Sequence, residues 1–146
     1  MYSFRKAMNS DKDILLEWTN NPLTREMSLD DKIVSSKEHS IWFARSLKKR
    51  GSEIYIYEKR DEQKKTPVAS VRIDTKGSKN FLSWNVSEAM RNKGVGSKML
   101  KEFVQIFKND YFAIIKKDNF ASMTICSRSG FRKYYSRENI TYWKNF

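Results

Sequence analysis

The sequence has one cysteine and no long apolar run, and both shortages restrict what the protein can be. Cys126 is alone among 146 residues, so the chain has no internal disulfide, and a reducing, cytoplasmic location is the default expectation. No apolar run reaches about 18 residues, which argues against a transmembrane helix. The opening residues, Met1 to Lys6, look like a strand and lack the apolar centre of a signal peptide. A membrane partner is therefore not expected.

Glycine is also scarce, with five residues, but two of them stand together in Arg91-Asn92-Lys93-Gly94-Val95-Gly96. A dinucleotide fingerprint would need a third glycine near Met99, and the Gly-Lys-Ser/Thr ending of a phosphate-binding loop is absent. The turn lies between a strand-like and a helix-like segment, where free backbone amides and the helix dipole favour an anion. Arg91 and Lys93 add positive charge, so the turn is predicted to bind a phosphate group, although glycine there for turn geometry alone is the competing explanation.

The charge balance is strongly basic, with a formal net charge of +12. Such an excess suggests an anionic partner, whereas the spread of lysines along the chain is equally explained by solubility. A basic nucleic-acid-binding module is a trailing alternative, because motifs with interleaved aromatic residues are absent. With 39% hydrophobic residues and this length, residues 1–146 are expected to form a single domain with a real core.

The pattern of apolar residues and turn signals predicts an α+β sheet that is antiparallel early and parallel around the helix after the glycine turn. A polar connection is expected over residues 23–28. Strands are predicted over residues 2–8, 53–58, 66–74, 80–86, 111–115, 131–135 and 141–146, with helices after residue 11, after Ser35, after the glycine turn and from Phe120 to about Ser129.

The segment Val86 to Ser97 resembles the acetyl-CoA signature of the GNAT superfamily of N-acetyltransferases, Arg/Gln-x-x-Gly-x-Gly/Ala. A second block, Asn119 to Ser122 followed by Ser129-Gly130-Phe131, is similar to a later segment of that superfamily. The resemblance covers nearly the whole chain. It implies a GNAT fold, with a mixed central sheet of about seven strands flanked by about four helices, and acetyl-CoA as cosubstrate.

The same resemblance implies how the coenzyme is held. Backbone amides of the glycine turn would hold the pyrophosphate, with Arg91 and Lys93 neutralising it. The strand before the turn would splay from its neighbour and pair with the pantetheine, and an amide near Asn85 or Val86 would polarise the thioester carbonyl. The expected coenzyme-binding residues are Trp84, Asn85, Val86, Arg91, Asn92, Lys93, Gly94, Val95, Gly96, Ser97, Asn119 and Ser122.

The catalytic acid of the resembled family is commonly a tyrosine four residues before the glycine of Gly130-Phe131, and this chain has Cys126 there. A thiol can in principle donate the proton, although a small buried helix residue is the plainer interpretation of Cys126. Tyr134 or Tyr135 are the substitutes, or water protonates the leaving thiolate. His39, the only histidine, is the candidate base, with a purely structural role as its alternative. No metal ligands are expected.

The acceptor side is indicated by two patterns, Trp18 to Arg25 and Glu38 to Phe43. They resemble acetyltransferases of nucleotide-linked deoxy-amino sugars, as in pseudaminic acid pathways, and also enzymes that acetylate ribosomal-protein N-termini. The favoured acceptor is therefore a UDP-linked amino sugar. A protein N-terminus or lysine, and a coenzyme-binding GNAT protein with weak activity, are the alternatives, and a homodimer is left open. The expected acceptor-binding residues are Arg25, His39, Trp42 and Ser83. Arg25 would grip a phosphate, and Trp42 would provide a stacking surface.

Overall fold

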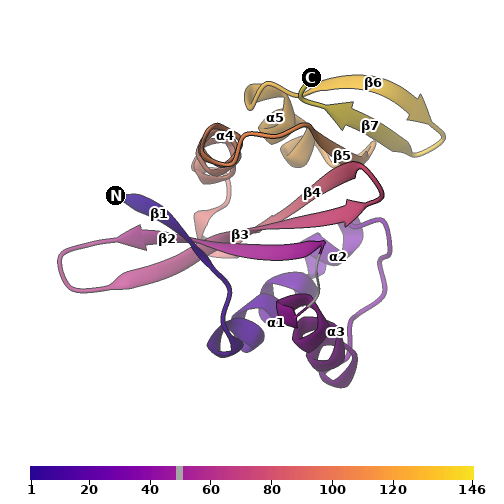
Figure 1. Cartoon of the computed structure of the whole chain (residues 1–146). Coiled ribbons are helices and arrows are strands. Elements are labelled where there is room, and N and C mark those ends of the chain that lie inside the picture. Colours follow the sequence, from indigo (N-terminus) through magenta and orange to yellow (C-terminus); the bar gives the residue numbers. More distant parts are fainter. Residues whose placement is uncertain (49–50) are drawn as a thin grey trace.

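The computed structural model describes residues 1–48 and 51–146 of the chain. Its strands are β1 (Tyr2–Lys6), β2 (Ser52–Arg60), β3 (Lys65–Lys76), β4 (Lys79–Val86), β5 (Tyr111–Lys116), β6 (Arg132–Arg137) and β7 (Ile140–Lys144). Its helices are α1 (Lys12–Asn20), α2 (Pro22–Met27), α3 (Ser36–Lys48), α4 (Val95–Ile106) and α5 (Phe120–Arg128), with short 3-10 turns η1 (Asn9–Asp11) and η2 (Glu88–Met90). The strands form one seven-stranded sheet in the order β1-β2-β3-β4-β5-β7-β6, which confirms the predicted α+β class (Figure 1).

Helices cover the two faces of the sheet unequally (Figure 1). On one face, Leu15 and Trp18 of α1 and Phe43 of α3 form a small core with Ile54 and Ile56 of β2. On the other face, α4 supplies the main core. Its residues Met99, Leu100 and Phe103 are fully buried and join a cluster built on β2, β3, β4, β5 and β7. This stripe recurs at helical spacing, which explains why α4 forms and which side it buries.

Residues 23–28 are largely helical, and the prediction of a polar connection there was wrong. Pro22 occupies the first turn of α2, where a missing N–H costs nothing, and the Asn21 side chain accepts a hydrogen bond from the Leu23 amide at 3.1 Å. The chain therefore turns at Asn21 and starts a new helix instead of entering a loop. The described residues consequently contain five α-helices, one more than expected.

The sheet opens between β4 and β5, its one parallel pair among the described strands. Only two residue pairs align there, Asn80 with Tyr111 and Phe81 with Phe112, although β4 continues to Val86 and β5 to Lys116. Each strand keeps its antiparallel partner on the other side, β3 for β4 and β7 for β5. The two halves of the sheet therefore diverge beyond Phe81, as the splay expected for this strand requires.

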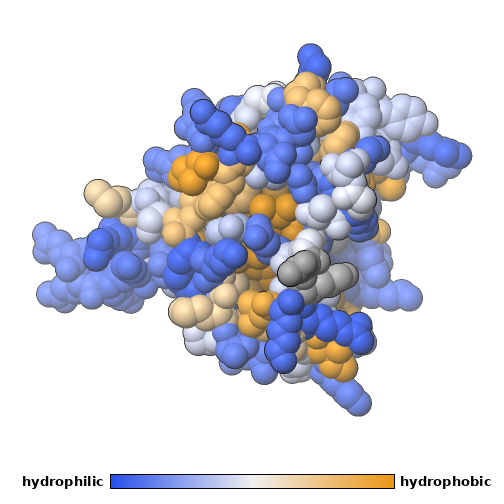
Figure 2. Space-filling model, in the orientation of Figure 1, coloured by the Kyte–Doolittle hydropathy of each residue, from blue (hydrophilic) through white to orange (hydrophobic). Residues whose placement is uncertain are grey.

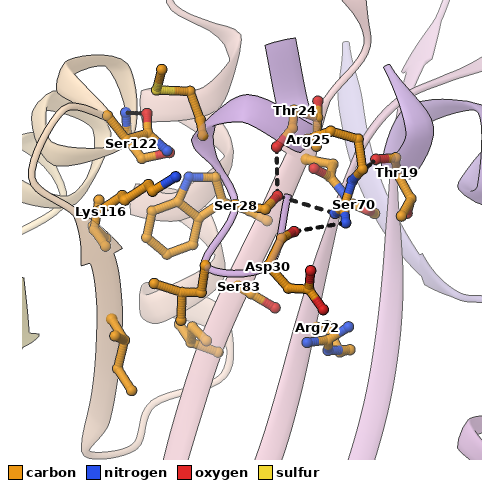
Figure 3. A pocket seen from close by; sticks show the side chains of 18 of the residues that line it. Thr19, Thr24, Arg25, Ser28, Asp30, Ser70, Arg72, Ser83, Lys116 and Ser122 are labelled. Atoms are coloured by element: carbon orange, nitrogen blue, oxygen red, sulfur yellow. Dashed lines mark hydrogen bonds between the residues drawn. The ribbon is translucent and has the colours of Figure 1, made fainter. Parts of the chain in front are cut away.

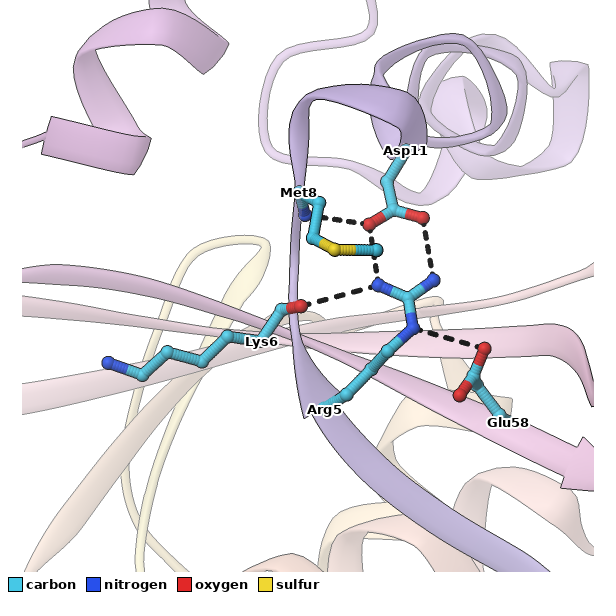
Figure 4. A network of polar contacts seen from close by, with 5 residues as sticks. All are labelled: Arg5, Lys6, Met8, Asp11 and Glu58. Atoms are coloured by element: carbon cyan, nitrogen blue, oxygen red, sulfur yellow. Dashed lines mark hydrogen bonds and ion pairs between the residues drawn. The ribbon is translucent and has the colours of Figure 1, made fainter.

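A charged network ties the first strand to the sheet and to the first helix (Figure 4). The guanidinium of Arg5 donates to both carboxylate oxygens of Asp11, at 2.7 and 2.8 Å, and forms an ion pair with Glu58 at 3.0 Å. Asp11 also accepts from the Met8 amide at 2.7 Å. These hydrogen bonds hold the pKa of Asp11 below its usual value and that of Arg5 above its usual value. Both carboxylates are buried, so the pairing offsets their loss of hydration.

The β2–β3 hairpin extends away from the helices, and hydrophilic side chains gather over it (Figure 2). In the part of the chain that the structure describes, no helix has the length and apolar character needed to cross a membrane.

Candidate active site

The glycine turn directs the chain from β4 into α4 through two residues with left-handed backbone. Asn92 has φ +60°, and Gly94, which caps α4, has φ +77°. Side chains other than glycine and asparagine rarely adopt this conformation, so the sequence Asn-Lys-Gly suits the turn. The first amides of α4 are left without helical partners and lie at the positive end of the helix dipole. The turn therefore has the features of an anion site that its sequence predicted.

Gly96, in the first turn of α4, is needed for close packing. A β-carbon at this position would lie 2.5 Å from Ile125 Cδ1 on α5 and 3.3 Å from Val86 Cγ2 on β4. The absence of a side chain lets α5 approach the start of α4 directly.

A pocket of about 610 Å³ opens beside this turn, between β4, α4 and α5. We call it the glycine-turn pocket. Eleven of the twelve expected coenzyme residues line it, namely Trp84, Asn85, Val86, Arg91, Asn92, Gly94, Val95, Gly96, Ser97, Asn119 and Ser122. Lys93 is exposed and is not among the lining residues.

Asn119 caps α5, because its Oδ1 accepts a hydrogen bond from the Ser122 amide at 3.1 Å. This side chain, which is expected to bind the coenzyme, therefore also fixes the start of α5 beside the pocket.

Arg91 is bound to protein groups. Its guanidinium donates to Thr24 Oγ1 at 2.6 Å, to Asn21 Oδ1 at 3.1 Å and to the Val86 carbonyl at 3.3 Å. These bonds join the glycine turn to the start of α2, so Arg91 also has a structural role, and its contact with a phosphate stays a prediction. Its partners Asn21 and Thr24 lie 70 and 67 residues earlier in the chain, so sequence spacing gave no sign of them.

A second pocket of about 330 Å³ lies where the sheet opens, between β4, β5, α2 and α3. We call it the Arg72 pocket. In Figure 3 the side chains of Ser83 and Arg72 on the strands face Asp30, on the segment after α2, while Lys116 and Ser122 lie at the other side. The two pockets share seven lining residues: Thr24, Met27, Ser28, Trp84, Asn85, Asn119 and Ser122. They therefore meet at the splayed strand end.

Trp84 stands at this junction with an unused donor. Its indole Nε1 is buried and has no hydrogen-bond partner among residues 1–48 and 51–146. A buried N–H without an acceptor costs free energy, so a ligand carbonyl at the junction would satisfy it. The sequence placed Trp84 at the site but gave no sign of this free N–H.

Arg72 is the residue of the site that sequence reasoning missed. Its Nε donates to Asp74 Oδ2 at 2.7 Å, and its guanidinium lies 5.3 Å from the centre of the Trp42 ring. The contact with Trp42 orients the planar guanidinium at the pocket. The bond to Asp74 uses only Nε and leaves the two terminal nitrogens available for a ligand. The available signal was the presence of one charged residue within the mostly apolar run from Val68 to Ile73.

A family model for the acetyltransferase (GNAT) domain matches residues 3–132. The chain belongs to the GNAT acetyltransferase family. Solved structures share its fold. A domain from Methanocaldococcus jannaschii is 19% identical with a TM-score of 0.81, covering 99% of this chain and 97% of that one. An aminoglycoside acetyltransferase in complex with coenzyme A is 14% identical with a TM-score of 0.77, covering 99% and 94%.

A ribosomal-protein-alanine N-acetyltransferase from Brucella melitensis is 18% identical with a TM-score of 0.72, covering 97% of this chain and 98% of that one. Identities this low support the fold and not the acceptor. A search of curated proteins gave no match. The GNAT fold predicted from the sequence is confirmed, and the chain is an N-acetyltransferase with acetyl-CoA as cosubstrate.

The guanidinium of Arg25 in this GNAT acetyltransferase is hydrogen-bonded to nearby residues of the chain. It donates to the carbonyls of Thr19 at 2.7 Å, Asp30 at 3.0 Å and Lys32 at 2.9 Å, and to Ser28 Oγ at 3.1 Å. A guanidinium with these bonds has little donor capacity left for a phosphate, so the expected grip is corrected to a structural role. Arg25 instead shapes the segment that carries Asp30 to the Arg72 pocket.

The three expected catalytic side chains do not line either pocket. Cys126 is fully buried in the main core, and burial raises the pKa of its thiol far above the usual range, which opposes the acid role. Tyr134 lies on the edge strand β6 and is 46% exposed. His39 is 2% exposed and packs parallel to the Phe43 ring, with centroids 5.9 Å apart. Burial lowers the pKa of His39, and its buried position within α3 leaves the ring no direct contact with an acceptor in either pocket.

Proposed function

We propose that this GNAT acetyltransferase acetylates the primary amine of an acceptor that also carries negative charge, most simply a nucleotide-linked deoxy-amino sugar. The observation that carries the proposal is Arg72, held by Asp74 and stacked on Trp42 in the pocket that adjoins the coenzyme side. A planar guanidinium whose terminal nitrogens are bonded by none of the described residues matches two phosphate or carboxylate oxygens.

The glycine-turn pocket is the proposed coenzyme site. The amides from Asn92 to Ser97 would hold the pyrophosphate, and the edge of β4 from Trp84 to Val86 faces the opening where β5 has diverged. The unpartnered Trp84 Nε1 at the junction fits a ligand carbonyl. When bound, acetyl-CoA supplies an activated acetyl thioester, and this chain would direct it toward the Arg72 pocket.

The charges lining the Arg72 pocket favour such an acceptor. Arg72 and Lys116 line it with Asp30 as the single carboxylate among its described residues, and Arg25 is already bonded internally. A polyamine without an anionic group would place several cations beside Arg72 and Lys116 with one carboxylate to offset them. A phosphate next to Arg72 and an amine next to Asp30 would place each charge of the acceptor beside a side chain of opposite charge.

Asp30 is the proposed acceptor of the ammonium proton, directly or through water. Its Oδ1 accepts the Lys32 amide at 3.0 Å, which fixes the carboxylate on the loop facing Ser83 (Figure 3). Changing Asp30 to Asn keeps the shape of the side chain but removes the carboxylate that would take the proton, so kcat should fall by about 10²-fold or more, and an unchanged kcat would exclude this role.

The test measures the release of the free thiol of coenzyme A with each of four acceptors. It compares a UDP-linked 4-amino sugar, the same amino sugar without the nucleotide, a peptide with a free N-terminus, and kanamycin. We expect turnover to be highest with the nucleotide-linked sugar. Arg72→Gln should reduce kcat/KM for that acceptor by about tenfold or more, since a hydrogen bond to a charged group contributes about 1.5–3 kcal/mol. Arg72→Lys should recover part of the loss, because it keeps the charge without the planar fork.

Lys65→Gln on the distant β2–β3 hairpin is the matched control and should leave the acceptor preference unchanged. Faster turnover of the peptide would move the assignment to protein N-termini. Acetyl-CoA binding without turnover of any acceptor would instead favour a coenzyme-binding GNAT protein with weak activity.

A further inference from the structure

The sheet face beyond the Arg72 pocket carries a group of aromatic rings from four strands and the C-terminal residue. We call it the aromatic face, defined by Phe81, Phe112, Tyr134, Tyr135, Tyr142 and Phe146. Ring centres lie 5.6 Å apart for Phe81 and Phe112, 6.2 Å for Phe112 and Tyr134, and 5.5 Å for Tyr135 and Tyr142. Strand alternation places Phe112 on the face opposite the buried Tyr111 and Ala113, and a bulge between Lys133 and Tyr135 irregularly spaces the tyrosines of β6.

Several of these rings are exposed. Tyr134, Tyr135 and Phe146 retain 46%, 51% and 44% of their accessible surface. The helices α4 and α5 belong to the other face of β5 and β7, where Ala113, Ile115 and Trp143 join the main core. Exposed rings gathered on one sheet face are unusual for a surface whose only task is solubility.

Lysines lie over the rings. Lys144 Nζ is 5.2 Å from the centres of both Tyr134 and Phe146, and Lys79 Nζ is 5.1 Å from the centre of Phe112. Lys76 Nζ lies 5.9 Å from Phe81. The carboxylate paired across the sheet from Phe81 is Asp74, which is already bonded to Arg72. The aromatic face therefore combines exposed rings with positive charge.

A second copy of the chain is a poor match for this surface. A two-fold symmetric contact would bring the lysines of both copies into one interface, with Asp74 already bonded to Arg72. Like charges opposed in an interface are costly, so the charge pattern favours an anionic partner. An acidic peptide would match the lysines but would leave the rings without stacking partners.

We propose that the aromatic face binds single-stranded RNA. Single strands are recognised by aromatic rings on which bases stack, combined with cations that contact the phosphates. The hydroxyls of Tyr134, Tyr135 and Tyr142 give the surface groups that can bond a ribose 2′-hydroxyl, which favours RNA over DNA. The surface continues into the Arg72 pocket through β5, since Ile114 and Lys116 share the Phe112 face and line that pocket. Because these rings come from separate strands, no aromatic motif appears in the sequence. The sequence alone therefore disfavoured a nucleic-acid partner.

The test measures fluorescence anisotropy of a fluorescein-labelled 12-nucleotide oligouridylate at several salt concentrations. Tyr134→Ala combined with Tyr135→Ala should weaken binding by about tenfold or more at fixed salt, because each base that stacks on an aromatic ring adds to the binding affinity. Lys79→Gln combined with Lys144→Gln should reduce the slope of log affinity against log salt by about 1.4, at about 0.7 per phosphate contact. Lys59→Gln and Lys65→Gln on the distant hairpin form the matched control and should leave affinity nearly unchanged.

Circular dichroism and urea unfolding establish that each variant is folded, and Tyr134→Leu with Tyr135→Leu is the second variant if the alanine pair does not fold. Equal binding by the tyrosine variants and the wild type would overturn the proposal, because charge alone would then explain affinity. Tighter binding of oligodeoxythymidylate of the same length would overturn the assignment to RNA. A dimer in sedimentation that the tyrosine variants dissociate would show that the surface is an interface between copies instead.

Discussion

Gly96 on α4 lies directly against Ile125 on α5, so closely that a β-carbon at Gly96 would reach Ile125 Cδ1 at 2.5 Å. Gly96→Ala should therefore push α5 away from the start of α4. We expect a loss of about 1–3 kcal/mol in the free energy of unfolding, the usual cost of overpacking, together with weaker acetyl-CoA binding. Urea unfolding and isothermal titration calorimetry measure the two effects.

The double variant Gly96→Ala with Ile125→Ala separates packing from other causes. Removing the branched side chain frees the space, so the double variant should recover much of the coenzyme affinity lost in Gly96→Ala. Ile125→Ala alone serves as the control for the cavity that it leaves. Additive losses in the double variant would show that contact with Ile125 is not the reason for glycine at position 96.

Arg91 and Thr24 should behave as one unit. The Arg91 guanidinium donates to Thr24 Oγ1 at 2.6 Å and so joins the glycine turn to α2. Thr24→Val removes the acceptor while keeping the shape, and it should weaken acetyl-CoA binding although Thr24 carries no charge. A double-mutant cycle with Arg91→Ala should show an interaction energy of about 0.5–3 kcal/mol in calorimetry. If Arg91 acted only as a free phosphate ligand, Thr24→Val would leave the affinity unchanged.

Trp84→Phe tests the unused indole N–H at the junction of the two pockets. Phenylalanine keeps an aromatic ring but removes the buried donor Nε1. If that donor bonds the reacting carbonyl, kcat should fall by about tenfold or more, since removing one preorganised donor of this kind costs about 10²–10³ at the strongest sites. The free energy of unfolding should not fall through loss of a hydrogen bond, because Nε1 bonds none of the residues that the structure describes. An unchanged kcat would exclude Trp84 Nε1 from this role.

His39 should make stability depend on pH. Burial lowers its pKa from the usual 6.5, and Lys12, across the contact from α1, lowers it further while Asp13 raises it. The folded state therefore favours the neutral ring, and the unfolded state binds more protons below about pH 6.5. The stabilisation is present above that pH and is lost as the pH falls toward the folded-state pKa.

Urea unfolding of wild type and His39→Phe between pH 7.5 and 5 measures this dependence. The phenylalanine variant keeps a ring stacked on Phe43 and should show a flatter profile. Asp11, whose pKa is lowered from 3.8 by Arg5, contributes its own pH dependence only at more acidic values. Identical slopes for the two proteins would mean that His39 does not titrate differently in the folded and unfolded states.

The fold was predictable because its signals are local. Apolar periodicity marked α4 through Met99, Leu100 and Phe103, and the glycine turn and Asn119 marked the two helix starts that surround the coenzyme pocket. Gly94 has left-handed backbone and Gly96 has no room for a side chain, so both glycines of the motif have a physical reason. These are properties of neighbouring residues, which a sequence displays directly.

The acceptor side was harder because its contacts join distant segments. Arg25 seemed free to hold a phosphate, but its bonds to Thr19, Asp30 and Lys32 depend on how the loop after α2 folds back. Cys126 stood at the family's tyrosine position, yet that face of α5 packs into the core. Arg72 was not predicted as a site residue, because its orientation depends on Trp42, which lies on α3 about 30 residues earlier in the chain.

Thermal unfolding with and without acetyl-CoA tests the central claim, that the glycine-turn pocket holds the coenzyme. Acetyl-CoA at about 100 times its Kd should stabilise the wild type by about 2.7 kcal/mol and raise Tm accordingly. The same concentration should shift Gly96→Ala much less, and Lys65→Gln on the distant hairpin as much as the wild type. No shift of the wild-type Tm at saturating acetyl-CoA, or an equal shift in Gly96→Ala, would contradict the account.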